Sequence, residues 1–354
     1  MAFTIFAGGA TGAYLSTDSS ANYFSSNSGN DAVGPTRGFT KDNDYLYTCT
    51  SQGVFRSSDN GATWLSRSSG LTNLLTSGII KVGSNLFVVG PTGVFKSSDN
   101  ADNWNTAGLS TIDIRSIAAI NDTLFVGTNG AGIYKSVDWG LNWVSVNNGL
   151  GSASNFRAIE SKGNTLFAAG PTGTGVFRSL DFGSNWILLS GGLSSGSYRG
   201  FASSSQLIVA GSFGSGVFYS TDNGDNWTVI NSGLTDLTVF DLELNDSYII
   251  AATNTQGVFR LALSNLNLSL GIADLSKNTI AIYPNPTTNQ IHIKTDVQLL
   301  GSTYFIYDKT GKSILSGRID SENTVVKLDN LSGGIYVLRI GDNDLNQTFK
   351  VIKE

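Results

Sequence analysis

The chain has 354 residues, of which 14% are charged and 42 are glycine, and its net charge of −5 gives a pI near 4.9. This acidic balance, without any basic run, excludes a nucleic-acid-binding surface, and no apolar stretch reaches the ~18–20 residues of a membrane span. The only cysteine, Cys49, excludes an intramolecular disulfide. Cys49 lies in an alternating run, YLYTCT, which predicts a buried strand residue.

The first residues, MAFTIFAGGATG, contain an apolar patch with no basic segment before it. The patch is too short for the apolar region of a signal peptide, so we do not expect one here. FTIFAGG instead resembles the second strand of the repeat described next. We therefore expect an N-terminally incomplete first repeat.

A short segment of the form GVF recurs at intervals of 39 to 43 residues over the first two thirds of the chain. Each period has room for about four short strands, which is the size of a propeller blade, and lone blades cannot bury both faces. The sequence predicts an all-β fold over 1–265, a β-propeller of seven four-stranded blades with the first incomplete; six or eight blades are the alternatives. The segments begin at Gly12, Gly53, Gly93, Gly132, Gly175, Gly216 and Gly257.

A turn of the form S-x-D-x-G-x-x-W follows most of these segments, and we call it the box turn. Its Ser and Asp side chains can accept hydrogen bonds from the turn's own N–H groups, and its Gly can adopt a positive φ. Two copies are degenerate: Ala101 replaces the Gly in one, and Ser20 and Tyr23 replace Gly and Trp in Ser16–Tyr23. The good copies comprise Ser57, Asp59, Gly61 and Trp64; Ser97, Asp99 and Trp104; Ser136, Asp138, Gly140 and Trp143; Ser179, Asp181, Gly183 and Trp186; and Ser220, Asp222, Gly224 and Trp227.

This spacing resembles the Asp-box, or BNR repeat, of sialidases, xyloglucanases and many non-enzymatic propellers. The resemblance implies that the box lies at the outer rim of each blade, away from the central cleft. Its aspartates are then structural and are not catalytic carboxylates.

The repeat stops after Leu263, and we expect a linker over 266–278 and a small Ig-like β-sandwich over 279–354, where alternating strands are separated by turn signals. The motifs YPNP, DKTGK and LSGGIYV and the lysine-containing end of the chain resemble the type A sorting domain of the type IX (Por) secretion system. The alternative is an Ig-like binding module that shares the PNP turn. The motif residues are Pro284, Asn285, Pro286, Gly311, Gly334, Tyr336, Lys350 and Lys353.

This second resemblance implies a Bacteroidetes-type bacterium, recognition by the type IX machinery, and export across the outer membrane. The protein would be secreted or attached to the cell surface, often after removal of the domain.

The predicted propeller contains no histidine, which removes Ser-His-Asp and His-metal mechanisms, and we expect no cofactor and no metal. Glycoside hydrolysis needs only two suitably separated carboxylates. The available suppliers outside the box turns are Asp113, Glu160, Asp236, Asp241 and Glu243.

Four arginines, Arg37, Arg115, Arg157 and Arg199, occupy one position at the start of the predicted first strands, where Ser77 and Val239 stand in two other blades. First strands line the central channel of a propeller, so these arginines could bind a carboxylate or another anion at its mouth. The alternative is that each one bonds to a neighbouring blade. Arg56, Arg178 and Arg260, after GVF, are expected at the rim.

Two box turns carry an aromatic residue, Trp139 or Phe182, after their Asp. Exposed aromatics on adjacent loops could stack on sugar rings; the alternative is packing on neighbouring strands.

Enzymes usually interrupt such repeats with insertions that build a cleft, and a period of 39 to 43 residues leaves little room for one. We therefore expect a secreted or cell-surface, non-enzymatic, monomeric propeller that binds a glycan or protein partner. The alternative is a secreted glycoside hydrolase of the sialidase or xyloglucanase type. An assembly factor like the photosystem-associated propellers fits the arginines but not the sorting domain.

Overall fold

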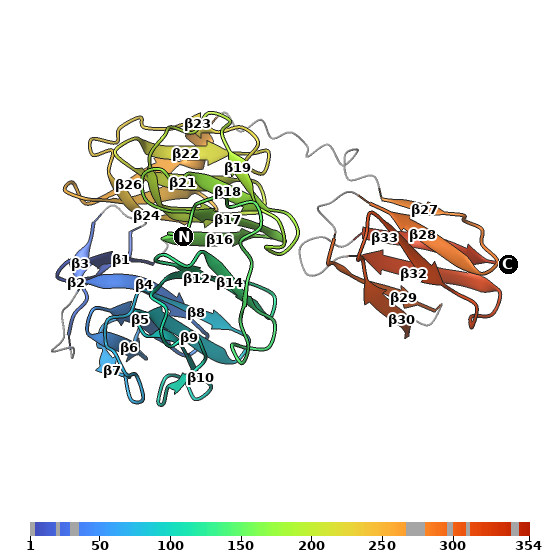
Figure 1. Cartoon of the computed structure of the whole chain (residues 1–354), viewed down its shortest axis with the longest axis horizontal. Coiled ribbons are helices and arrows are strands. Elements are labelled where there is room, and N and C mark those ends of the chain that lie inside the picture. Colours follow the sequence, from blue (N-terminus) through green and yellow to red (C-terminus); the bar gives the residue numbers. More distant parts are fainter. Residues whose placement is uncertain are drawn as a thin grey trace. The chain divides into compact units, whose positions relative to one another are not determined.

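The computed structural model describes residues 4–18, 22–28, 35–266, 280–295, 300–308, 312–340 and 347–354. It divides into two compact units, 1–268 and 269–354, which are considered separately. Apart from the 3-10 turn η1 (Leu263–Asn265), the secondary structure of the described residues is all β (Figure 1). None of the described residues forms a helix long and apolar enough to cross a membrane.

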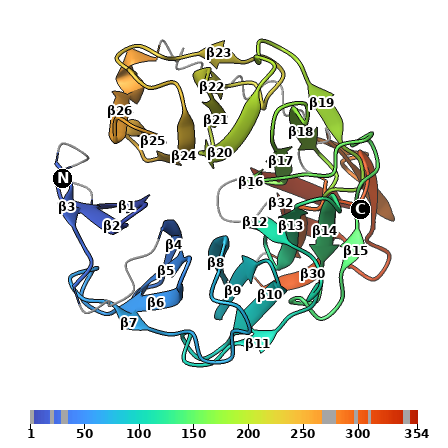
Figure 2. The ribbon, with the colours of Figure 1, turned by 60° about the vertical axis from the view of Figure 1, so that its left-hand side comes forward.

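The first unit is a ring of seven antiparallel sheets, numbered here as blades one to seven in chain order (Figure 2). In blades two to six the four strands follow one another from the axis of the ring to its perimeter. Their bounds are β4 (Thr36–Lys41), β5 (Leu46–Thr50), β6 (Gly53–Ser57) and β7 (Leu65–Ser66); β8 (Gly78–Val82), β9 (Asn85–Gly90), β10 (Gly93–Ser97) and β11 (Asn105–Thr106); β12 (Ile114–Ile120), β13 (Thr123–Thr128), β14 (Ile133–Ser136) and β15 (Val144–Ser145); β16 (Ala158–Lys162), β17 (Thr165–Ala169), β18 (Val176–Ser179) and β19 (Ile187–Leu189); and β20 (Ser197–Ser203), β21 (Ile208–Phe213), β22 (Gly216–Ser220) and β23 (Thr228–Val229).

The described parts of the first and last blades are three-stranded. Blade one consists of β1 (Ile5–Gly9), β2 (Gly12–Ser16) and β3 (Phe24–Ser25), and β1 stands where the other blades have their second strand. Blade seven consists of β24 (Val239–Leu244), β25 (Tyr248–Thr253) and β26 (Val258–Ala262). The prediction of an all-β propeller of seven blades is confirmed; among the described residues blade one has no strand inside β1, and blade seven has three strands where four were predicted.

The core of the ring lies in layers between neighbouring blades. One layer joins Ile133 of blade four to Phe156 and Phe177 of blade five. The second strand of a blade has such a layer on both faces. Its sequence is therefore a continuous run of apolar or small residues and does not alternate between apolar and polar residues. Cys49 in β5 is fully buried in the layer between blades two and three, and burial raises the pKa of its thiol to about 12.

The second unit is a sandwich of two antiparallel sheets. Its core contains Ile293 and Val326 from one sheet and Ile306 and Leu338 from the other, all almost fully buried. The three-stranded sheet contains β27 (Ala281–Tyr283), β28 (Gln290–Lys294) and β31 (Asn323–Lys327), and the four-stranded sheet contains β29 (Thr303–Tyr307), β30 (Ser313–Arg318), β32 (Gly334–Ile340) and β33 (Gln347–Lys353).

The PNP turn is hydrogen-bonded to the last strand of the chain. The Asn285 side chain donates to Lys350 O at 2.7 Å and accepts from Ile352 N at 2.9 Å. Lys353 Nζ donates to Thr288 O at 2.6 Å. The first and last predicted motifs are therefore neighbours in space, while Gly311 lies outside the described residues.

The first residue of the predicted linker, Leu266, is buried in the core between blades six and seven. The rest of that segment, residues 267–278, lies outside the described residues.

Candidate functional site

In the box turns, both oxygens of the Asp carboxylate accept hydrogen bonds from the turn itself. In blade four, Ser136 Oγ donates to Asp138 Oδ1 at 2.8 Å and accepts from Gly140 N at 2.9 Å. Asn142 then donates from its backbone to Asp138 Oδ1 and from its side chain to Asp138 Oδ2, at 2.9 and 2.8 Å. A carboxylate with both oxygens occupied is held ionised and is unsuited to proton transfer.

The same pattern recurs in the other turns. In blade three the Asn103 side chain is the main cause that lowers the pKa of Asp99 to about 2. The degenerate first turn keeps the bonds of Ser16 and Asn22 to Asp18. The residue four positions after the Asp is thus a member of the motif that our sequence analysis missed, although its repetition was visible. It is Asn22, Thr63, Asn103, Asn142, Asn185 or Asn226.

The box tryptophans tie each blade to the one before it. Trp186 is 3% exposed, and its Nε1 donates to Val146 O of blade four at 2.8 Å. Trp104 and Trp143 donate in the same way to Arg67 O and Ala107 O, both at 2.8 Å. Each of these three tryptophans therefore packs between two blades and satisfies a carbonyl of the preceding blade, whereas Trp64 donates to Ser26 Oγ and Trp227 to Gly224 O of its own turn.

Two arginines that follow GVF make the opposite link, to the following blade. Arg178 Nη1 donates to Asn223 O at 2.6 Å and forms an ion pair with Asp225 at 2.8 Å. Arg56 bonds in the same way to Asn100 O at 2.6 Å and Asp102 at 3.0 Å. These cations hold the box turn of the next blade through the carbonyl of its positive-φ residue, a contact that repeat spacing does not predict.

The four arginines of the predicted anion site do share one structural position, which is a β-bulge at the start of the innermost strand. The residues before and after Arg37, Arg115 and Arg199 pair with two consecutive residues of the second strand, so each arginine is the extra, unpaired residue of a bulge. Arg157 N donates to Ala169 O, and the next residue, Ala158, is paired with the same Ala169. A bulge changes the direction of its side chain relative to the rest of the strand, and the arginines occupy this equivalent position in their blades.

The bulge position of blade seven is Phe240, not Val239. Val239 pairs with Thr253 and Asp241 with Ala252, which leaves Phe240 as the extra residue. The alignment on Val239 was wrong by one because a bulge adds a residue that the alternation of side chains does not reveal. We call the six positions the bulge ring: Arg37, Ser77, Arg115, Arg157, Arg199 and Phe240.

The arginines of the bulge ring are in different states. Arg115 is neutralised by Asp113 of its own blade at 2.5 Å. Arg37 and Arg157 are exposed. Arg199 stacks its guanidinium on Phe213 and Phe240, at 4.4 and 5.2 Å from the ring centroids.

Arg199 lacks acceptors for part of its guanidinium. Its Nε is buried and makes no hydrogen bond to the described residues, and the Oγ of Ser197, a residue 5% exposed, is in the same state. Burial first, and then the positive charge of Arg157, lowers the pKa of Arg199. Buried donors without an acceptor are unusual, and a carboxylate is a favourable acceptor for the N–H groups of an arginine.

The five carboxylates proposed for glycoside hydrolysis are not equivalent. Asp113 is paired with Arg115, and Asp236 accepts bonds from Thr238 N, Thr255 N and Thr255 Oγ1. Asp113 therefore serves in an ion pair and Asp236 in a turn.

The remaining acids, Glu160, Asp241 and Glu243, lie on innermost strands near one another. Burial, together with the negative charges of the other two, raises the pKa of Glu160 to about 7, although Ser203 Oγ donates to it at 2.9 Å. Asp241 is exposed as a residue, but the protein atoms around its carboxyl partly desolvate the charge, which raises its pKa to about 6.

The two aromatic candidates contact the protein itself. Trp139 is half-buried and stacks on Phe87 of blade three, with ring centroids 6.4 Å apart and planes at 14°. Phe182 is half-buried against the core layer of blades four and five. Packing on neighbouring strands therefore buries part of each side chain. Trp139 also lines a groove.

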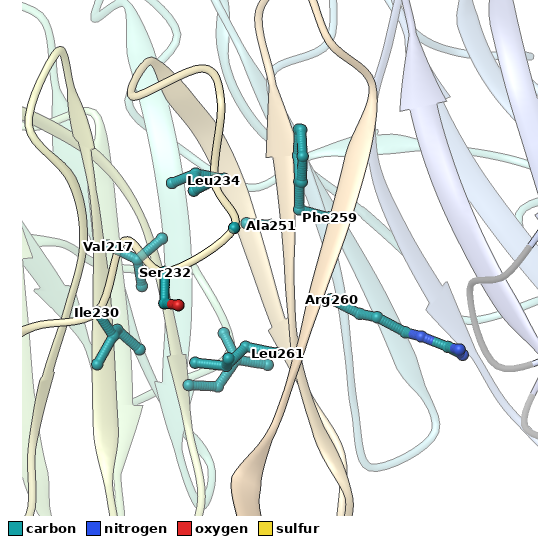
Figure 3. Close-up of a pocket in the computed structure, with 10 residues that line it drawn as sticks. Val217, Ile230, Ser232, Leu234, Ala251, Phe259, Arg260 and Leu261 are labelled. Atoms are coloured by element: carbon teal, nitrogen blue, oxygen red, sulfur yellow. The ribbon is translucent and has the colours of Figure 1, made fainter. Parts of the chain in front are cut away.

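A cavity of about 70 Å³ lies between blades six and seven, lined mainly by apolar groups such as Val217, Ile230 and Leu261 (Figure 3). The side chain of Arg260 points away from these groups. The cavity is much smaller than the ~300 Å³ of typical ligand sites, and it offers few polar groups. We therefore do not treat it as a binding site.

Residues 281–354 match the family of secretion system C-terminal sorting domains, Por_Secre_tail. A sorting domain of the type IX system directs a protein to that secretion machinery, and so to secretion or attachment at the outer-membrane surface. No curated protein matches the chain.

Several solved propellers are similar in fold. PorZ, an essential surface component of the type IX secretion system of Porphyromonas gingivalis, is 14% identical with a TM-score of 0.56, over 97% of this chain and 55% of that chain. YCF48 bound to D1 peptide is 12% identical with a TM-score of 0.61, over 74% of this chain and 90% of that one. A GH74 xyloglucanase from Xanthomonas campestris is 14% identical with a TM-score of 0.57, over 73% and 50%. The chain thus spans about half of PorZ, and these likenesses identify the propeller fold alone.

Proposed function

Because residues 281–354 form a sorting domain of the type IX system, we propose that the chain is an exported binding propeller that captures a carboxylate-bearing segment of a protein partner. The binding site is the part of the bulge ring around Arg199. The observation that carries this proposal is the pair of buried, unsatisfied donors, Arg199 Nε and Ser197 Oγ. Buried polar groups are almost always satisfied, so such a pair points to a ligand that supplies acceptors.

The surroundings of Arg199 favour a peptide over a small ion. Phe213 and Phe240 are 45% and 39% exposed and pack together with centroids 6.0 Å apart. Leu237 is 39% exposed and lies beside the turn that follows Phe213, because its carbonyl accepts hydrogen bonds from Gly214 N and Gly216 N. Exposed apolar side chains beside a cation suit a partner that presents both an acidic and an apolar side chain.

Binding of acidic peptides should depend on Arg199. With the full chain immobilised, a library of short peptides should yield sequences containing Asp or Glu next to an apolar residue. Arg199→Ala should weaken the selected peptide about 10- to 100-fold, because hydrogen bonds to charged groups contribute about 1.5–3 kcal/mol. Calorimetric titration measures the effect.

Two comparisons control this experiment. Arg260→Ala, which removes an exposed arginine that stacks on Tyr248 outside the bulge ring, should leave the affinity unchanged. The same peptide with Gln in place of Glu should bind the original chain as weakly as the acidic peptide binds Arg199→Ala. Equal affinity of the acidic and neutral peptides would refute the proposal.

A glycoside hydrolase is the second candidate, because Glu160 with a pKa of about 7 beside the Asp241 carboxyl has the character of an acid–base pair. The full chain would then hydrolyse at least one member of a panel of chromogenic glycosides, and Glu160→Gln would abolish the turnover. Such a result would replace the binding proposal. Turnover that survives Glu160→Gln, or no turnover, removes this candidate.

A further inference from the structure

A groove of about 270 Å³ lies at the rim of the ring between blades three and four. One wall comes from β10, β11 and the turn between them, and the other from the box turn of blade four. The groove combines an aromatic ring, polar groups and one cation, and its size approaches that of a small-molecule site. The lining residues used below are Lys96, Ser98, Asn105, Thr106, Trp139 and Leu141.

Trp139 occupies a backbone conformation that bulky residues avoid. Its φ is +63°, in the left-handed region, where the corresponding residues of three other box turns are Asn60, Asn100 and Asn223. Asparagine tolerates this region far better than tryptophan. A strained residue held in place by its surroundings is a reason to look for a function.

The surroundings fix the indole as a rigid platform. One neighbour is Phe87, whose ring plane is inclined by only 14°. The far end of the indole lies 3.5 Å from the position that a Cβ on Gly83 would take. Lys96 Nζ lies 5.7 Å from the centroid of the indole. An immobilised ring loses little entropy when a ligand stacks on it.

The charge of Lys96 is uncompensated. Among the described residues no carboxylate lies within ion-pair distance of it. The corresponding cations Arg56 and Arg178 instead bind an Asp of the next blade. Leu141, 81% exposed, stands in blade four at the position of those aspartates. The groove therefore keeps a cation without an ion pair where Arg56 and Arg178 are paired; Lys135 of blade four also lacks an ion pair but donates to Phe182 O.

We propose that this groove binds a uronic-acid oligosaccharide, independently of the peptide site at the bulge ring. The apolar face of a pyranose ring would stack on Trp139, as flat sugar faces do on aromatic rings. Asn105, Thr106 and Ser98 supply hydrogen-bonding groups for its hydroxyls, and Lys96 pairs with its carboxylate.

The test is a titration of the full chain with a hexuronic-acid tetrasaccharide and with a neutral hexose tetrasaccharide of the same linkage. Binding is followed by calorimetry and by the fluorescence of the tryptophans. The uronide should bind at least tenfold more tightly than the neutral sugar, and Lys96→Met should remove this preference. If Lys96→Met keeps the preference, or if the original chain binds neither sugar, the proposal is wrong.

Variants at Trp139 separate binding from folding. Trp139→Asn introduces the residue that other box turns carry, so the relief of backbone strain offsets part of the lost stacking and the fold persists. It should weaken uronide binding at least tenfold, whereas Trp139→Tyr, which keeps an aromatic platform, should retain most of it. The matched control Phe182→Asn makes the same change one blade further and should leave binding unaltered. Equal binding by Trp139→Asn would refute the proposal.

Two further measurements identify the class of ligand and the site. A poly-glutamate peptide of the same charge should not displace the uronide, and displacement at equal concentration would show that the groove binds acidic peptides instead. Arg199→Ala should leave uronide binding unchanged. A loss of uronide binding in Arg199→Ala would move the sugar to the bulge ring and overturn the rim assignment.

Discussion

Replacing Trp186 by alanine is expected to lower the free energy of unfolding of the propeller by about 3–5 kcal/mol, the usual cost of truncating a buried tryptophan. The side chain is 3% exposed and fills the layer between blades four and five. Its loss also leaves the carbonyl of Val146 without its 2.8 Å donor. Urea denaturation of the full chain, followed by tryptophan fluorescence and circular dichroism, measures the change.

Two variants divide this effect into its parts. Trp186→Phe keeps most of the apolar volume and removes only the bond between blades, so it should cost less than Trp186→Ala by roughly 2 kcal/mol. Trp143→Ala should cost less than Trp186→Ala, because Trp143 is only half-buried. A loss below about 1 kcal/mol for Trp186→Ala would contradict a role in joining the blades.

Replacing Glu160 by glutamine is expected to raise the free energy of unfolding by roughly 1–3 kcal/mol at pH 8.5 and to have little effect at pH 4. The pKa of the carboxyl is about 7 in the folded chain, against 4.5 as the ordinary value. A raised pKa means that the folded state favours the protonated form. The contribution of Glu160 to stability is therefore complete below pH 4.5 and is lost as the pH rises to 7, because the buried charge must then form.

Glutamine carries no charge and can still accept the 2.9 Å hydrogen bond from Ser203. Glu160 retains some contact with water, which places the gain toward the lower part of the range. Thermal unfolding of both chains between pH 4 and pH 8.5 gives the two curves, which should meet at acidic pH and separate above it. Parallel curves over the whole range would show that Glu160 ionises normally. Glu322→Gln, an exposed position of the sandwich, is the control.

The number of blades could be predicted from the sequence because the box turn is a local structure. Ser136, Asp138 and Asn142 lie within seven residues, and their side chains bond to one another and to the backbone of the turn. A motif with such short-range bonds forms in the same way in each of the six repeats that carry it, and its spacing together with the GVF segment of the seventh repeat gives the number of blades. The PNP turn and the lysine-containing end of the chain were recognised as parts of one domain for a different reason, their family resemblance.

The candidate site could be predicted only in part, because it depends on register and on contacts between repeats. The shared position of the arginines follows from the repeat, but the bulge that carries them does not, and this displaced the equivalent of blade seven from Phe240 to Val239. Whether an arginine is neutralised depends on a single neighbour: Arg115 has Asp113, whereas Arg199 has two aromatic rings. Such differences between equivalent positions depend on neighbouring residues that are distant in the sequence. The pattern of a single repeat does not show these neighbours.

The links between blades also determine where the ring is weakest. The tryptophans of blades three to five donate to the preceding blade, and the cations of blades two, four and five donate to the following blade, so opening an inner blade breaks bonds on two sides. At the end of the ring this reciprocity fades: Trp227 donates to Gly224 O of its own turn, and the seventh repeat carries no box turn for blade six to hold. Local opening should therefore start at the seam between blades seven and one, and amide hydrogens there should exchange with solvent before those of blades three to five. The box turns thus divide the ring into a central cooperative unit and a less stable margin.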